Sequence, residues 1–372
     1  MRTRPRHRCA SQFVTMNFPQ IKLQHFFSLC DDTGLFQHAH YSVPNRKKGY
    51  STDDVARAIV FLCNHCSVQD NPRAMKILSV CVSFLHFANR PDGAFHNFLS
   101  YNRRWVDRTG SEDSHGRAIW AAGTASRASA LDAAARNAAE EIFRNSAGRI
   151  VRFRSPRSRS FGMLGCAPAR DIDVAQDMLR EGGNFLVRLF KDTARKGWQW
   201  FEPYLTYCNA RIPHALYLAY DVFENEEYLD VAEESMRFLI NVMFEEDMLD
   251  VPGNHAWFEA GGTKSTFDQQ PVEAGTMVEA LVCAFHVTRS GEYLDRAAQA
   301  LEWYHGKNRI GRALIDPSTG ACYDGLMPSG VNKNQGAEAV LSYLLARTEY
   351  DAAIRSPARK PGARESLVVR QA

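Results

Sequence analysis

One short pattern recurs along this chain and constrains its fold more than any other feature. It is a turn with polar and aromatic residues that leads into a hydroxyl residue, then acids, then an apolar helix. In the first copy, residues 49–62, Thr52 can cap the first N–H groups. Asp53 and Asp54 follow in the first turn, where the helix dipole favours negative charge. Alone, this copy indicates only a capped helix, so its recurrence carries the argument.

Further copies occur at residues 111–120, 206–216, 267–274 and 332–341, and a weaker copy without acids at 155–164. Such spacings are typical of stacked supersecondary units. Between the copies lie helices with more surface charge, which are expected outside, with the recurring helices inside. The sequence therefore predicts an all-α (α/α)6 toroid of six helical hairpins. The expected inner helices are 53–66, 113–127, 156–166, 209–223, 270–288 and 335–347, and the outer ones are 18–30, 72–89, 129–146, 171–190, 226–245 and 292–306.

The hairpins follow one another without a break, which predicts one domain at residues 17–354. The chain has 372 residues, of which 45% are hydrophobic, enough for one large core. Residues 1–16 and 355–372 are rich in arginine and lack apolar periodicity, so they are predicted to be a disordered basic extension and a disordered tail. The first segment could also be a transit peptide or an over-long start before Met16.

Charge and cysteine content exclude several classes of function. The formal net charge is +3, but the two basic tails account for more than all of it, and the acidic body argues against binding to nucleic acid. No apolar run approaches the roughly 18 residues of a membrane span. The nine cysteines are odd in number and scattered mostly in apolar helices, which predicts reduced thiols and a cytoplasmic location. No cofactor or metal is expected, since nucleotide and zinc motifs are absent, with calcium on loop carboxylates the one exception.

The long loops all precede expected inner helices, so they should gather at one end of the toroid. Residues 91–110 alternate in polarity and predict a small β-hairpin there. Aromatic rings suit the C–H faces of sugars, and carboxylates and amides suit their hydroxyls. The alternative is that these side chains only tie the loops down. The expected substrate-binding residues are Asp53, Glu112, His115, Arg117, Trp105, Trp200, Trp257, Gln269, Gln270, Glu273, Asp324, Asn334 and Glu338.

Several carboxylates in one partly dry funnel will not all stay ionised, which can produce a general acid beside a base. Glu202, set among aromatic residues, is the first candidate for the acid, and Asp268 or Asp54 for the base. Asp113 and Glu338 are expected to orient hydroxyls. Glu202 and Asp268 precede neighbouring inner helices, which pack about 8–10 Å apart. That spacing predicts an inverting glycosidase, because inversion needs roughly 6.5–9.5 Å between the carboxyls.

Residues 49–54, 110–117, 200–202, 267–274 and 334–338 resemble a bacterial family of helical-toroid proteins. Its members are often labelled glycosyltransferase, because the domain is fused to or encoded near group 1 glycosyltransferases and mannoside phosphorylases. The toroid is similar to the six-hairpin glycosidase superfamily. The resemblance covers roughly residues 20–348 and implies carbohydrate metabolism, an oligosaccharide substrate with mannose-containing glycans as first candidates, and a glycosyltransferase as a candidate partner. The two Rossmann-like domains of a glycosyltransferase are absent, so the label is not taken literally.

The chain departs from the usual family pattern at Ser51, Val55, Cys208 and Ala339 but keeps the acid positions. The favoured interpretation is a glycoside hydrolase. One alternative is a sugar epimerase of the N-acylglucosamine 2-epimerase type, with His115, His214 or His255 as acid and base. The other is a non-catalytic glycan-binding partner of a glycosyltransferase.

Overall fold

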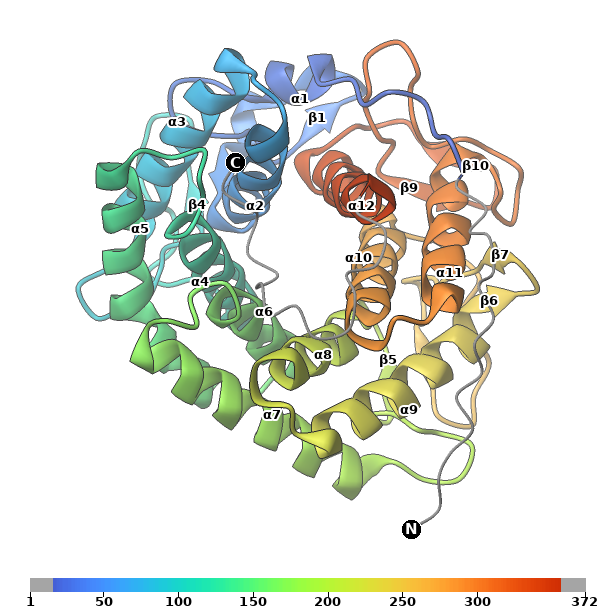
Figure 1. The fold of residues 1–372 in the computed structure, drawn as a ribbon. Helices are drawn as coiled ribbons and strands as arrows, with labels where there is room; N and C mark the ends of the chain where they lie inside the picture. Colours follow the sequence, from blue (N-terminus) through green and yellow to red (C-terminus); the bar gives the residue numbers. More distant parts are fainter. Residues whose placement is uncertain (1–15, 356–372) are drawn as a thin grey trace.

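The computed structural model describes residues 16–355, which form two concentric layers of helices around one axis (Figure 1). The predicted (α/α)6 toroid is confirmed. The inner layer consists of α2 (Thr52–Val68), α4 (Glu112–Ala125), α6 (Pro156–Cys166), α8 (Arg211–Phe223), α10 (Pro271–Thr288) and α12 (Ala337–Arg355). The outer layer consists of α1 (Gln24–Leu29), α3 (Pro72–Ala88), α5 (Ala133–Ser146), α7 (Asp173–Thr193), α9 (Glu226–Met243) and α11 (Gly291–Glu302).

The pattern of burial explains the two layers. In α10, every residue from Pro271 to Phe285 is buried, as a helix covered on all sides requires. In α7, the buried residues recur at helical spacing along one face, from Ala175 through Leu179 to Phe190. The inner helices α4 and α6 can approach each other very closely because Gly123 and Gly165 have no side chains. A Cβ atom at Gly123 would collide with the backbone of Gly165.

Serine caps start three of the inner helices. The side chains of Ser51, Ser111 and Ser155 accept hydrogen bonds from backbone N–H groups in the first turns of α2, α4 and α6. The prediction that Thr52 caps α2 is therefore wrong by one residue. Thr52 is the first helical residue, and its hydroxyl donates instead to the carbonyl oxygen of His96 at 2.6 Å.

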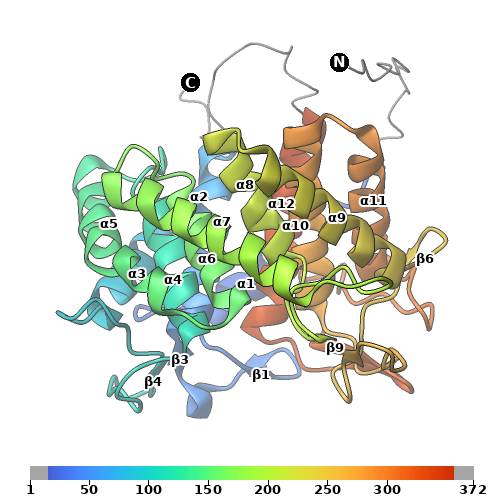
Figure 2. The same cartoon turned by 90° about the horizontal axis from the view of Figure 1, so that it is seen from below.

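Short strands and turns lie in the connections between the helices, and every strand pair within residues 16–355 is antiparallel. The pairs are β1 (Ala39–His40) with β2 (Val43–Pro44), β3 (Tyr50–Ser51) with β4 (Phe98–Leu99), β5 (Tyr204–Leu205) with β8 (Phe258–Glu259), β6 (Phe244–Glu245) with β7 (Met248–Leu249), and β9 (Gly325–Met327) with β10 (Gly330–Asn332). Figure 2 shows β1, β3, β4 and β9 at the same end of the toroid. Three 3-10 helices complete the described elements: η1 (Arg46–Lys48), η2 (Ala147–Arg152) and η3 (Trp303–His305).

The hairpin expected at residues 91–110 forms only in part. Leu99 makes an antiparallel bridge to Trp105 inside this segment, but β4 pairs with β3, which leads into α2. The loop is thereby attached to the start of an inner helix, because cross-strand hydrogen bonds can join segments that are distant in sequence.

Both ends of the described chain differ from expectation. The helix predicted at 18–30 begins only at Gln24, because the preceding segment packs against α12 instead, with the Arg347 guanidinium donating to the carbonyls of Phe18 and Pro19. Helix α12 continues to Arg355, beyond the predicted end at 347. The predicted disordered segments fall mostly on residues 1–15 and 356–372, which lie outside the described part. Among residues 16–355, no helix combines the length and apolarity needed to cross a membrane.

Candidate active site

Polar side chains from the N-terminal ends of all the inner helices meet at the end of the toroid that carries the loops, here called the mouth. Contacts link them into two sets that meet at the neighbouring residues Arg157 and Ser158, and together they are here called the mouth network. Its members are Asp53, Asp54 and Arg57 of α2, Asp113 and Arg117 of α4, Arg157 and Ser158 of α6, Asn209 just before α8, Glu273 of α10 and Glu338 of α12, together with Glu202 from a loop.

Two buried arginines join the first half of the network. Arg57 lies 2.7 Å from Glu338, 2.6 Å from Asp53 and 3.0 Å from Asp54. Arg117 lies 3.1 Å from Asp53 and 3.4 Å from Asp113. The two guanidiniums therefore connect α12, α2 and α4. Both arginines stand four residues after an acid, the spacing at which helical side chains face one another.

Hydrogen bonds continue the network through the other half of the ring. The Ser158 hydroxyl donates to Asp113 at 2.5 Å. Arg157 donates to Glu202 at 2.5 Å and to the Asn209 side chain at 3.0 Å. The Asn209 amide donates in turn to Glu273 at 3.0 Å. One set of polar contacts thus runs from α12 to Ser158 of α6, and a second set runs from the preceding residue, Arg157, to α10.

The network combines buried carboxyls with more accessible carboxylates. Burial raises the pKa of Asp54 to about 7, against the opposing effect of Arg57. Burial likewise raises the pKa of Glu273 to about 7, although hydrogen bonds from Cys208 and Asn209 oppose it. Glu202 and Asp113 are more accessible, with side chains 12% and 15% exposed. The mouth therefore holds protonatable carboxyls beside carboxylates that a ligand can reach, as acid–base chemistry needs.

Hydrogen-bond partners distinguish the two buried carboxyls. Both oxygens of Glu273 accept from groups that can only donate, the Cys208 backbone N–H and the Asn209 NH2 group. A proton on Glu273 would weaken one of these bonds, because the protonated oxygen is a poorer acceptor and neither partner can accept its O–H. Asp54 instead contacts the Ser51 hydroxyl at 2.6 Å, and a hydroxyl can turn from donor to acceptor. Asp54 is therefore the carboxyl better suited to carry a proton.

Asp268 lies in the loop before α10 and has a histidine beside it. The imidazole Nε2 of His255 is 3.8 Å from the Asp268 carboxylate, and the two side chains are 68% and 32% exposed. The next residue, Gln269, pairs through its backbone with Leu326 of β9. Asp268 thus stands between the inner helix α10 and the hairpin β9–β10.

Two of the predicted binding residues belong to the core instead. Trp200 is fully buried and packs against Phe201 and Phe238, the latter on α9. Gln269 is also fully buried, and its side chain bonds to Asp250 at 2.7 Å and to the Trp303 indole at 3.0 Å. Both side chains tie the loops to the outer layer, so we leave them out of the proposed site.

Three further predicted residues hold the loops in place. Glu112 accepts hydrogen bonds from the backbone N–H groups of Arg154 and Ser155, just before α6. His115 is buried, packs on Phe153, and its ring bonds to the Phe95 carbonyl oxygen. Burial lowers the His115 pKa, so this ring stays neutral near pH 7. Trp105 stacks on His96 and packs against Phe84 and Phe87 of the outer helix α3.

Three predicted residues flank the start of α10 or α12. Asp324 accepts from the Gly336 N–H at 2.6 Å, just before α12, and burial raises its pKa to about 6. Asn334 accepts from the Tyr41 N–H at 3.0 Å. Gln270 is the N-cap residue of α10, where its side chain makes no capping hydrogen bond.

The sequence interpretation missed Arg57, Arg157, Ser158 and Asn209, which hold the network together. Arg57 had a usable signal, because the acid-to-arginine spacing of Asp53–Arg57 is repeated in Asp113–Arg117. The others had no comparable spacing, since their partners Glu202, Asp113 and Glu273 are distant in sequence. No group of three or more His, Cys, Asp or Glu residues within 16–355 is arranged to hold a metal ion.

Trp257 is the predicted aromatic residue that approaches the network. It is partly exposed and lies 6.5 Å from the ring of Tyr207, over which Arg157 packs at 5.3 Å.

We expect Trp257→Ala to weaken saccharide binding by up to about tenfold, the size of one aromatic contact, with little change in melting temperature. Calorimetric titration and thermal unfolding would measure the two effects. Trp105→Ala is the matched control and should lower stability without changing affinity. Loss of solubility in Trp257→Ala would place that ring in the core.

No protein-family model and no curated protein matches this sequence. Solved structures do match it over most of its length. A sugar epimerase from a ruminal bacterium has a TM-score of 0.68 at 12% identity, covering 91% of this chain and 96% of that one. Cellobiose 2-epimerase from Bacillus thermoamylovorans has a TM-score of 0.71 at 9% identity, and the match covers 90% of this chain and 96% of the epimerase. An α-1,6-mannanase from Salegentibacter has a TM-score of 0.58 at 12% identity, and the match covers 88% of this chain and 96% of the mannanase.

The likeness establishes the fold. It is the (α/α)6 toroid that the two epimerases and the mannanase also have, as the sequence predicted. At these identities fold does not fix activity, which has to be argued from the site. None of these matches carries the glycosyltransferase label that the sequence resemblance suggested.

Proposed function

We propose that this protein is a carbohydrate-active enzyme that hydrolyses a glycosidic bond in an oligosaccharide. The observation that carries the proposal is the mouth network, in which Asp54, a buried carboxyl with a pKa raised to about 7, lies near Asp53 and Glu338, whose side chains are 23% and 48% exposed. Glycoside hydrolysis needs one carboxyl that gives a proton and one carboxylate that activates water. The sugar epimerases and mannanase that share the fold support a saccharide as the ligand.

In the proposed mechanism, Asp54 gives its proton to the leaving glycosidic oxygen as the bond to the anomeric carbon breaks. Water attacks that carbon from the opposite face, and Asp268 takes the proton from the water. Glu202, which the sequence suggested as the acid, is paired with Arg157 and is proposed instead to orient sugar hydroxyls with Asp113 and Glu338. The products are a free sugar of inverted anomeric configuration and an alcohol. Mannose-containing oligosaccharides are the first candidate substrates.

A saccharide screen with product analysis tests this proposal, beginning with mannosides. We expect a released sugar whose first-formed anomer, followed by NMR, is inverted. Retention would overturn the pairing of Asp54 with Asp268 across a water molecule. Binding without turnover of any saccharide would favour the glycan-binding partner of a glycosyltransferase instead. The eight free cysteines of the described residues support a proposed cytoplasmic location.

Activity should fall as the pH rises above about 7. Asp54 acts as the acid only when protonated, and its pKa is raised to about 7 by burial. Its protonated fraction therefore decreases through neutral pH, whereas an ordinary aspartic acid with a pKa of about 3.9 would already be ionised. A profile of kcat/KM from pH 5 to 9 measures this alkaline limb. A profile that stays flat to pH 9 would contradict the role of Asp54.

The pair of His255 and Asp268 favours a second candidate, sugar epimerisation. Of the three histidines considered, His115 is packed between loops and His214 faces a separate cavity of about 200 Å³ that Cys283 and Glu349 also line. His255 alone of these three lies beside a carboxylate of the mouth, at 3.8 Å. An epimerase predicts that His255→Asn abolishes formation of the C2 epimer from a reducing sugar, while Asp54→Asn leaves it active. Chromatography of sugars incubated with each variant decides between the two reactions.

A further inference from the structure

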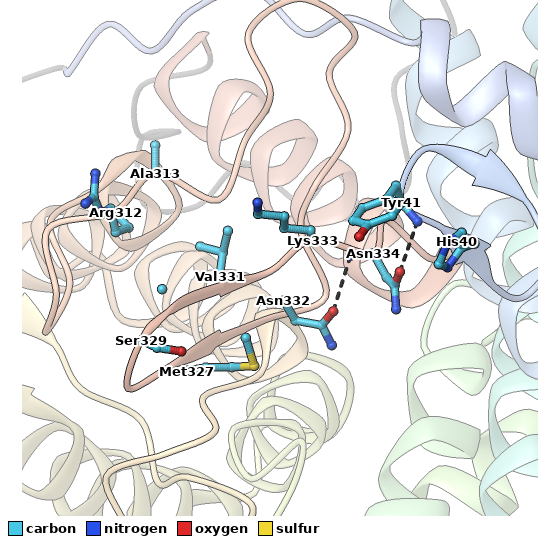
Figure 3. Close-up of a pocket in the computed structure, with 11 residues that line it drawn as sticks. His40, Tyr41, Arg312, Ala313, Met327, Ser329, Val331, Asn332, Lys333 and Asn334 are labelled. Atoms are coloured by element: carbon cyan, nitrogen blue, oxygen red, sulfur yellow. Dashed lines mark hydrogen bonds between the residues drawn. The ribbon is translucent and has the colours of Figure 1, made fainter.

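A cleft of about 680 Å³ lies next to the mouth, between the β1–β2 turn and the β9–β10 hairpin (Figure 3). His40 and Tyr41 form one side, and the opposite side includes Arg312, with Lys333 between them. The proposed hydrolysis uses none of the residues that line the cleft. Of these residues, only Asn334 belongs to the expected substrate-binding set.

The walls of the cleft are held by specific hydrogen bonds. The Asn334 side-chain oxygen accepts from the Tyr41 N–H at 3.0 Å, and the Asn334 N–H donates to the Asn332 side chain at 3.2 Å. On the other side, the Asn308 side chain donates to the Arg312 carbonyl at 2.7 Å and accepts from the Arg312 N–H at 3.2 Å. The backbone that carries Arg312 is therefore fixed before any ligand arrives.

The cleft presents positive charge without a counter-charge. Arg312 and Lys333 are exposed, and neither forms an ion pair with any residue in the part of the chain that the structure describes. No Asp or Glu of residues 16–355 is among those lining the cleft. The nearby acids Asp324 and Glu338 are engaged elsewhere, with the Gly336 N–H and with Arg57.

The cleft also opens close to the proposed reacting groups. Leu326 of β9 pairs with Gln269, the residue after Asp268. At the other edge, Asn334 lies in the loop four residues before Glu338 of the mouth network. A saccharide with one end at the mouth could therefore extend into the cleft.

We propose that this cleft binds an anionic substituent, a phosphate or a carboxylate, on the saccharide whose reacting end lies at the mouth. The proposal rests on the proposed function for the saccharide itself. The Arg312 guanidinium can bind a phosphate or carboxylate through two parallel hydrogen bonds, and the Lys333 ammonium adds a second charge. Asn332 and the Tyr41 hydroxyl supply neutral contacts for sugar hydroxyls.

Binding of mannose, mannose 6-phosphate and glucuronate, measured by calorimetry at low and at physiological ionic strength, tests the proposal. We expect an anionic sugar to bind at least about tenfold more tightly than mannose, the effect of hydrogen bonds to a charged group. The advantage should decrease with added salt and disappear in the Arg312→Gln, Lys333→Gln double variant. Lys76→Gln, on the exposed face of α3, is the matched control and should keep it. Comparing the two anionic sugars separates phosphate from carboxylate.

The outcomes separate this inference from the proposed function. Equal affinity for neutral and anionic sugars, with hydrolysis of a neutral glycan, would overturn the inference and leave the function standing. An anionic preference that depends on Arg312 and Lys333, without any hydrolysis, would support the inference and contradict the proposed reaction. No binding of any of the three sugars would overturn the inference. Both variant positions are exposed, so unchanged melting temperatures should show that the fold is intact.

Discussion

Asp54→Asn is expected to lower kcat by about 10²- to 10⁴-fold, the usual contribution of a general acid, while saccharide affinity changes little. The asparagine keeps the shape of the side chain and can still bond to Ser51 and Arg57, but it has no proton to transfer. Activity should return on a substrate that needs no acid assistance, such as a dinitrophenyl glycoside, because its leaving group departs as a stable anion. Steady-state kinetics on both substrate types measure the difference.

Glu273→Gln is the matched control for this experiment. Glu273 is as buried as Asp54 and has a pKa raised to the same value, about 7, but its hydrogen bonds suit a positioning residue. We expect any loss in Glu273→Gln to be the same for good and poor leaving groups. Selective rescue of Glu273→Gln by the dinitrophenyl substrate would transfer the acid role to Glu273.

Arg57→Met is expected to lower the free energy of unfolding by about 3–5 kcal/mol, the usual cost of removing one partner of a buried ion pair. The Arg57 side chain is only 5% exposed and contacts Asp53, Asp54 and Glu338. Its removal leaves Asp54 and Glu338 without the cation that pairs with them, whereas Asp53 keeps Arg117. Urea denaturation followed by circular dichroism gives the change in free energy.

Arg103→Met provides the contrast, because its ion pair with Asp32 is exposed on both sides, at 58% and 78%. Such a pair should contribute little to stability, because solvent screens both charges. Adding Asp54→Asn to Arg57→Met should recover part of the lost stability, since Asp54 is the buried acid whose ion pair is with Arg57. If the Arg57 and Arg103 variants are equally stable, the mouth network is not what holds the ring together.

The fold could be predicted from the sequence because the start of an inner helix is a local signal. Ser51, Ser111 and Ser155 each cap a helix within three residues in sequence, so the signal needs no knowledge of tertiary structure. Even α6, which lacks acids in its first turn, begins and ends where the weaker copy indicated. The N-terminal segment was harder, because its contact with Arg347 joins residues more than 300 positions apart.

The site could be predicted only in part, because its geometry depends on distant partners. The sequence located the acids at the helix starts and Arg117, but the expected site lacked the other cations, such as the Arg157 that reaches Glu202 across 45 residues. Trp200 illustrates the same difficulty from the other side. An aromatic residue beside an acid has the same appearance in sequence whether it faces a ligand or, as here, packs against Phe238 of α9.

The closure of the ring has a consequence for the time course of synthesis. Glu338 reaches Arg57 across 281 positions, and His25 bonds to the Gln335 backbone across 310. A nascent chain therefore carries Asp54 and Arg57 for most of its translation without the last inner helix that completes their surroundings. Contacts so distant in sequence form late and slowly. The proposed activity should thus appear only after α12 has left the ribosome, and shorter products of interrupted translation should lack it.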